Sequence, residues 1–210
     1  MKKAICLLLS VLMITLCFAG CGGKDKDNSS SDDAALGNIE ASAMEGKLDT
    51  IKYGLGAEVD EVKDHYKKLA DDYKASLEDE DEHHDHNPDA EDNFAYYSVE
   101  KKKGYTVIET TDARFYYIPK NEDAGVLAIA TDSEIFGFTP GVTSKYEVEM
   151  ELAEEGETVN AAEAEKLLLA VESDPIVILR STFDNYQLDF YFYDNVLITT
   201  TIVDTENWNV

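Results

Sequence analysis

The residues most suited to chemistry lie together between Glu78 and Asp92. Nine of these fifteen residues are acidic, none is Lys or Arg, and the run His83-His84-Asp85-His86 lies in the middle. Imidazole nitrogen and carboxylate oxygen are both ligands for zinc and similar divalent cations. The pattern therefore supports the hypothesis of a cation-collecting loop. Its candidate ligands are the nitrogens of His83, His84 and His86 and the oxygens of Asp85 and Asp89.

The same stretch also fits a solvated acidic insertion, residues 76–93, between a helix and a strand. Side chains of adjacent residues converge poorly on one ion, so this spacing is not that of a preformed tetrahedral zinc site. It also lacks the Asp-x-Asp-x-Asp-Gly pattern of a calcium loop. Both interpretations remain open on the sequence alone.

The N-terminus predicts export from the cytoplasm. Lys2 and Lys3 precede an apolar run, residues 4–19, in which only Ser10 and Thr15 are polar. A basic start followed by an apolar core of this length is typical of an export signal. The run is slightly shorter than the stretch of about 20 apolar residues that a membrane-spanning helix needs.

The apolar run ends in Phe18-Ala19-Gly20-Cys21, which resembles the lipobox of bacterial lipoproteins. That resemblance implies that residues 1–20 are a lipoprotein signal peptide and that the sulfur of Cys21 carries a diacylglyceryl group. Two acyl chains hold a protein stably on a bilayer, where one does not. The resemblance thus implies a chain anchored through Cys21 on the outer face of the cell membrane, with the lipid bilayer as a partner.

The charge balance excludes one class of partner. Lys and Arg total 18 against 44 Asp and Glu, which gives a formal net charge of −26. Nucleic acid is excluded because its binding requires a basic face that neutralises phosphates. The apolar fraction of 44% is that of a folded chain. Residues 21–47, however, are rich in Gly, Ser, Asp and Ala, which predicts a flexible tether between the lipidated cysteine and the folded part.

Residues 48–135 predict a helix followed by an antiparallel meander. Apolar residues recur at spacings of three and four over residues 51–73, which predicts one buried helix face. β-Branched and aromatic runs with short turns between them then predict four strands, at residues 94–99, 105–109, 113–119 and 126–131. The residues expected on the buried helix face are Val59, Val62, Tyr66, Leu69 and Tyr73.

Residues 136–210 predict a second unit of the same kind. Ser144 and Glu147 fit a capping box at a helix start, although the alternation of apolar and acidic residues over 146–152 also fits a strand. A further helix is predicted over residues 160–171, with its first residue as the N-cap. Three strands are predicted after it, at residues 176–182, 186–193 and 196–203. The expected fold class is therefore α+β, with two diverged helix-then-antiparallel-meander units of three to four strands each.

The two units resemble each other in the order of their elements and partly in sequence. The run Phe115-Tyr-Tyr-Ile118 is similar to Phe190-Tyr-Phe-Tyr193, and a glycine-containing turn, at Gly54 or Gly141, precedes each predicted helix. This arrangement resembles the tandem group of β-lactamase-inhibitor-protein-like and small outer-membrane-assembly lipoproteins. The resemblance implies a binding or assembly role rather than catalysis.

Tyrosines are concentrated on the predicted strands and provide a candidate binding surface. Side chains alternate between the faces of a sheet, so Tyr191 and Tyr193 share a face, while Tyr116 and Tyr117 lie on opposite faces. One face must be core. If the other is exposed, Tyr116, Tyr191 and Tyr193 form a recognition surface, since tyrosine is enriched at interfaces. The alternative, that helices cover one face and the other unit covers the second, fits the sequence equally well.

No catalytic constellation is apparent in the sequence. The serines lack a Gly-x-Ser-x-Gly setting, and the only cysteine left after cleavage, Cys21, is acylated in the lipoprotein interpretation. We therefore expect no enzyme but a membrane-anchored extracytoplasmic lipoprotein, a non-catalytic binding module for a protein or envelope partner. The alternative function is divalent-cation capture by the acidic loop, residues 78–92.

Calorimetric titration with zinc tests that alternative. If residues 78–92 collect cations, zinc added to the full chain produces a heat of binding. The binding strengthens as the pH rises because the imidazole ligands must lose their protons. An absence of heat at millimolar zinc would reject cation capture.

Overall fold

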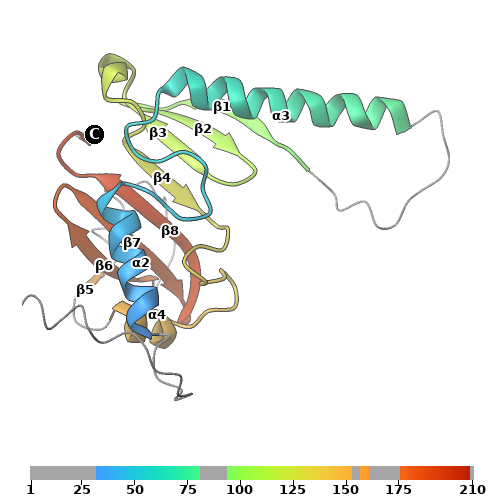
Figure 1. The fold of residues 1–210 in the computed structure, drawn as a ribbon. Helices are drawn as coiled ribbons and strands as arrows, with labels where there is room; N and C mark the ends of the chain where they lie inside the picture. The colour runs from blue at the N-terminus through green and yellow to red at the C-terminus, as the bar shows by residue number, and fades with distance from the viewer. Residues whose placement is uncertain (1–31, 81–93, 153–156, 161–175, 209–210) are drawn as a thin grey trace, which may run out of the picture. The chain divides into compact units, whose positions relative to one another are not determined.

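An eight-stranded antiparallel sheet runs through the described part of the chain (Figure 1). The computed structural model describes residues 32–80, 94–152, 157–160 and 176–208, which belong to one unit. The described α-helices are α2 (Asp32–Met44), α3 (Val59–Glu80) and α4 (Lys145–Leu152). The strands are β1 (Tyr97–Lys101), β2 (Thr106–Thr110), β3 (Arg114–Tyr117), β4 (Ala128–Thr131), β5 (Glu157–Asn160), β6 (Ile176–Phe183), β7 (Tyr186–Tyr193) and β8 (Val196–Asp204), with a short 3₁₀ segment, η1 (Pro119–Ala124), before β4.

Two antiparallel meanders meet in the middle of this sheet. The strand order is β1-β2-β3-β4-β8-β7-β6-β5. Within β1 to β4, and within β5 to β8, strands that are consecutive in the sequence are therefore neighbours in the sheet. The last strands of the meanders, β4 and β8, pair with each other, and Ile129 lies opposite Ile202. The prediction of a mixed α+β fold with antiparallel strands is confirmed. The strands predicted in 94–131 and 176–203 all form, with small differences at their ends.

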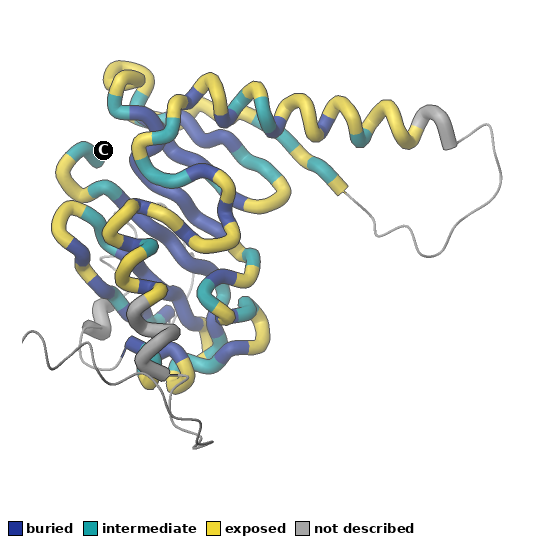
Figure 2. The backbone as a smooth tube through the Cα atoms, in the orientation of Figure 1, coloured by how far each residue is buried: buried dark blue, intermediate teal, exposed yellow. Residues whose placement is uncertain are grey.

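Both faces of the central strands are buried. Phe115 and Tyr117 belong to a large core cluster that also contains residues of all three described helices, and we call this side the helix-covered face. Tyr116 belongs to a second, smaller cluster with Val107 and Val203, as the alternation of side chains along a strand requires. In the tube view, buried residues mark the central strands, and exposed residues cover most of α3 (Figure 2).

The prediction of a tether that reaches residue 47 is wrong from the start of α2 onward. Ile39 and Ala43 are four residues apart, so they share one face of α2, and both are buried in the large core cluster. Gly46 ends the helix with a φ of +68°, while Lys47 N donates to Ser42 O at 2.9 Å, a Schellman-type stop. The composition indicates a coil because so few apolar side chains cannot stabilise a helix on their own. They stabilise α2 only because the sheet covers them.

Helix α3 forms where its apolar spacing predicts it, and it extends further, to Glu80. Val59, Val62 and Tyr66 are buried as expected, but Leu69 is 42% exposed and Tyr73 only partly covered. The C-terminal turns of α3 run beyond the strands (Figure 1). The outer half of the predicted buried face therefore has no sheet beneath it.

The segment after Ser144 is a helix rather than the competing strand. Ser144 N donates to Glu147 Oε2 at 2.7 Å, and Glu147 N donates to Ser144 Oγ at 3.3 Å, which is the reciprocal pattern of a capping box. Val148 and Leu152 are buried at helical spacing, while Tyr146 is exposed. The capping hydrogen bonds and this four-residue spacing prevail over the two-residue alternation.

Some predictions fall on residues outside the described ranges. The signal peptide and Cys21 are among them, as are the histidine-rich run 83–86 and the greater part of the helix predicted over 160–171. Asn160, the expected cap of that helix, is the last residue of strand β5. Strand β5 itself was not predicted.

Replacing Phe190 by alanine tests the central packing. Phe190 is completely buried on β7, with its ring 5.6 Å from that of Phe138. We expect the Phe190→Ala variant to lose about 3–5 kcal/mol of unfolding free energy, because the lost apolar contacts leave a cavity. The matched control is Tyr193→Ala on the same strand, where the side chain is 52% exposed, and we expect a loss near 0.5 kcal/mol. Urea denaturation measures both, and equal losses would contradict this packing.

Candidate functional site

The structure buries two of the three tyrosines that were predicted to form a binding surface. Tyr116 is 4% exposed and Tyr191 is fully buried, whereas Tyr193 is 52% exposed. The ring of Tyr116 lies 6.0 Å from that of Tyr105 and 6.2 Å from that of Trp208. The prediction of an exposed tyrosine surface is therefore wrong at Tyr116 and Tyr191, because both faces of the central sheet are covered there.

A polar cluster accompanies Tyr191 inside the sheet. Arg180 donates to both carboxylate oxygens of Asp189, from Nε and Nη2, at 2.9 Å each, and Gln187 donates a third hydrogen bond at 3.0 Å. Burial raises the pKa of the Asp189 carboxyl, against the opposing effect of these hydrogen bonds. The cluster joins the neighbouring strands β6 and β7, and the Asp189 carboxylate itself has no exposed surface.

An open groove lies beside the C-terminal half of α3. Its volume is about 400 Å³, which falls within the range of small-ligand and side-chain pockets. Three segments of the chain form it: α3 itself, the residues that lead into β1, and the turn between β2 and β3. The lining residues are Tyr66, Leu69, Asp72, Tyr73, Ser76, Phe94, Ala95, Tyr96, Thr111 and Asp112.

The β2–β3 turn holds the two walls of this groove together. Thr111 Oγ1 accepts a hydrogen bond from Tyr96 N at 2.8 Å and donates to Phe94 O at 3.3 Å, which fixes the segment before β1. On the other side, Tyr66 OH of α3 donates to Asp112 Oδ2 at 3.3 Å. Two adjacent turn residues thus bind opposite walls, and the groove is preformed.

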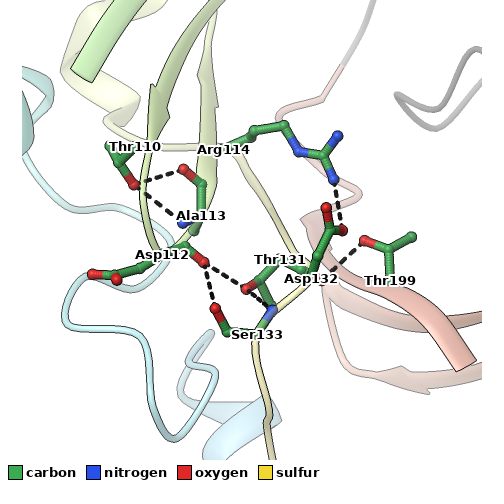
Figure 3. Close-up of polar contacts among 8 residues, drawn as sticks. All are labelled: Thr110, Asp112, Ala113, Arg114, Thr131, Asp132, Ser133 and Thr199. Atoms are coloured by element: carbon green, nitrogen blue, oxygen red, sulfur yellow. Dashed lines mark hydrogen bonds and ion pairs between the residues drawn. The ribbon is translucent and has the colours of Figure 1, made fainter. Parts of the chain in front are cut away.

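Hydrogen bonds also join the β2–β3 turn to residues at the end of β4 (Figure 3). Asp112 O accepts hydrogen bonds from Thr131 Oγ1 at 2.6 Å and from Ser133 Oγ at 3.3 Å. Ser133 N donates in turn to Thr131 Oγ1 at 3.0 Å. Because the main chain of Asp112 is held on this side, its carboxylate points away from Thr131 and Ser133 (Figure 3).

The remaining walls of the groove are apolar and aromatic. The rings of Tyr73 and Phe94 contact edge to face at 5.6 Å. Phe94 is 57% exposed, Tyr96 44% and Leu69 42%. Large apolar side chains that cluster in the open mark an interaction site more often than single exposed ones do. The groove therefore combines exposed apolar surface with the carboxylates of Asp72 and Asp112.

Sequence reasoning assigned these residues other roles. Leu69 and Tyr73 were expected in the core because their spacing continues that of the buried residues before them. Asp112 was expected only as part of a turn, and no pattern in the chain links it to Asp72. An indication lay in the length of the apolar helix face, which exceeds what a strand segment of about five residues can cover.

The other predicted site residues stay predictions. Cys21 and the run 83–89, which contains the proposed histidine and aspartate ligands, lie outside the described residues. Within the described part of the chain, no three His, Cys, Asp or Glu side chains gather closely enough to hold a metal ion.

An absorbance titration of tyrosinate tests the link between α3 and the turn. Burial raises the pKa of the Tyr66 hydroxyl well above its usual value, and the Asp112 carboxylate raises it further. The folded state therefore favours protonated Tyr66, and the protonated hydroxyl contributes to the free energy of unfolding. That contribution is fully present below the unfolded-state pKa of about 10, and it is lost as the pH rises through the folded-state pKa.

We expect Asp112→Asn to let Tyr66 ionise at lower pH than in the parent chain, although burial still keeps its pKa raised. Burial also raises the pKa of Tyr116 and Tyr191, so all three hydroxyls contribute to the late absorbance step. The Tyr66→Phe variant identifies the share of Tyr66, because it makes the late step smaller without removing it. A Tyr66→Phe chain that instead loses part of the absorbance step near pH 10 would contradict the buried hydrogen bond.

No family model, curated protein sequence or solved structure matches this chain. Among the described residues, no helix has both the length and the hydropathy to cross a membrane.

Proposed function

We propose that this chain is a membrane-anchored extracytoplasmic lipoprotein, a non-catalytic binding module that engages a protein or envelope partner through the groove beside α3. The exposed apolar wall of that groove carries the proposal. Phe94, Tyr96 and Leu69 remain open to solvent on a preformed site, whereas both faces of the central sheet are buried.

The chemistry of the lining supports binding rather than catalysis. The described residues of the groove include no histidine or cysteine. The hydroxyl of Ser76 donates to Tyr73 O at 2.6 Å, so it is engaged with the backbone rather than with a base. Aromatic rings on a rigid frame bury much surface at low entropic cost, as protein interfaces require.

The lipobox ending in Cys21 supports the anchored location. Because α2 begins at Asp32, the connection between the proposed lipid anchor and the folded unit has 11 residues rather than the 27 of the predicted tether, residues 21–47. At about 3.5 Å per residue, a connection of this length spans at most about 40 Å. The proposed anchor therefore keeps the folded unit within reach of envelope partners at the membrane.

We also propose that two helix-then-meander units, residues 48–135 and 136–210, derive from a duplication. The similar runs that begin at Phe115 and Phe190 lie on β3 and β7, each the third strand of its meander. Both phenylalanines belong to the same core cluster. This correspondence supports the resemblance to the tandem inhibitor-like group and its binding role.

Site-specific photo-crosslinking in intact cells tests the proposed function. A photoreactive phenylalanine analogue replaces Phe94 in the groove, and a second chain carries it at Tyr193, which has similar exposure but does not line the groove. We expect a discrete adduct from position 94 and none from position 193. The adduct should weaken in a Cys21→Ala chain, because loss of the lipid releases the module from the membrane.

Two outcomes would overturn this function. Equal adducts from both positions, or none from position 94, would remove the groove as the partner site. Mass spectrometry that finds residues 1–20 still attached and the Cys21 sulfur unmodified would remove the lipid anchor.

A further inference from the structure

We infer that the groove beside α3 binds a cationic side chain, lysine or arginine, that lies among apolar residues on a basic segment of a protein partner. This inference rests on the proposed function and names the chemistry of the partner. It follows from the charges, the helix end and the aromatic wall of the site.

Two acidic residues line the groove from different elements. Asp112 comes from the β2–β3 turn and Asp72 from α3. In the described part of the chain neither forms an ion pair with Lys or Arg, and the only side-chain partner of Asp112 is the neutral hydroxyl of Tyr66. A cation that enters the groove meets two unneutralised acids, and charge-assisted hydrogen bonds to such acids are the stronger kind.

The end of α3 brings no basic side chain that would offset these acids. The C-terminus of a helix carries a partial negative charge, which basic residues in the last turn commonly offset. The last turn of α3 has no basic residue. With a net charge of −26 on the chain, the surroundings attract cations and repel anions, which favours a basic partner over an acidic one.

The walls select an organic cation over a metal ion. No described group of three metal-binding side chains is present, whereas the ring pair Tyr73–Phe94 offers aromatic surface beside the acids. Cations bind favourably over aromatic faces, and the aliphatic stem of a lysine or arginine can pack on Leu69. A side chain with an apolar stem and a charged end matches both halves of the lining.

A peptide-binding experiment tests this inference on the full lipidated chain in phosphatidylcholine nanodiscs, with empty nanodiscs as the blank. The probe is the peptide Gly-Leu-Lys-Leu-Gly-amide with fluorescein on its N-terminal amine, and its uncharged match carries norleucine in place of lysine. Fluorescence anisotropy measures both affinities. We expect the lysine peptide to bind more tightly, by about 5-fold, and to lose affinity as salt is raised.

Matched variants locate the site. Asp72→Asn and Asp112→Asn should each weaken binding of the lysine peptide about 3- to 5-fold. Asp71→Asn is the control, because Asp71 is exposed on the same helix but does not line the groove. Phe94→Ala should weaken both peptides, since it removes the apolar wall. Circular dichroism checks that each variant is folded.

Three results would overturn the inference: equal affinity for the two peptides, an effect of Asp71→Asn as large as that of Asp72→Asn, or lysine-peptide binding unaffected by Phe94→Ala, which indicates attraction to the overall charge alone. The crosslink from position 94 distinguishes failure of this inference from failure of the proposed function. If the adduct forms in cells while the peptide preference is absent, the partner is of another chemistry and the binding function stands. If both are absent, both fail.

Discussion

Strand β4 pairs with β8, which lies much later in the chain, and the rest of the architecture depends on this pairing. All four residues of β4 are buried, and Ala128 and Ala130 keep one face of the strand flat. On the other face, Ile129 and its partner Ile202 join the core beneath the helices. Without this ladder, each meander would expose its last strand as an unpaired edge. With it, the two cores become one.

Because the two meanders join at their last strands, their first strands form the ends of the sheet. The outer residues of β1 are exposed, and α3 continues past that end of the sheet. The apolar face of α3 then exceeds the surface available to cover it, so Leu69 and its neighbours stay open. The groove therefore arises from the mismatch between a helix of 22 residues and strands of five. The β2–β3 turn makes it a defined site by binding both walls.

Local patterns identified most of the elements but not their partners. The strands, the turns at Asp184 and Asp194, and the Ser144–Glu147 cap each have a local cause, in side-chain alternation, turn chemistry or reciprocal hydrogen bonds. Helix α2 was missed because Ile39 and Ala43 give a weak pattern, and their burial depends on distant strands. The exposed tyrosine surface failed for the same reason, since alternation tells which residues share a face but not what covers that face.

The sequence by itself determined the acidic character and most of the element types, and it predicts export and lipidation at Cys21, because the patterns for elements and export each lie within a short stretch of the chain. Only the tertiary structure decided that both faces of the central sheet are covered, where α3 loses its cover, and that Asp72 and Asp112 line one groove with Phe94. Those facts depend on pairings between distant segments. Local sequence patterns do not specify such contacts, since their free energy is gained only when the whole sheet assembles.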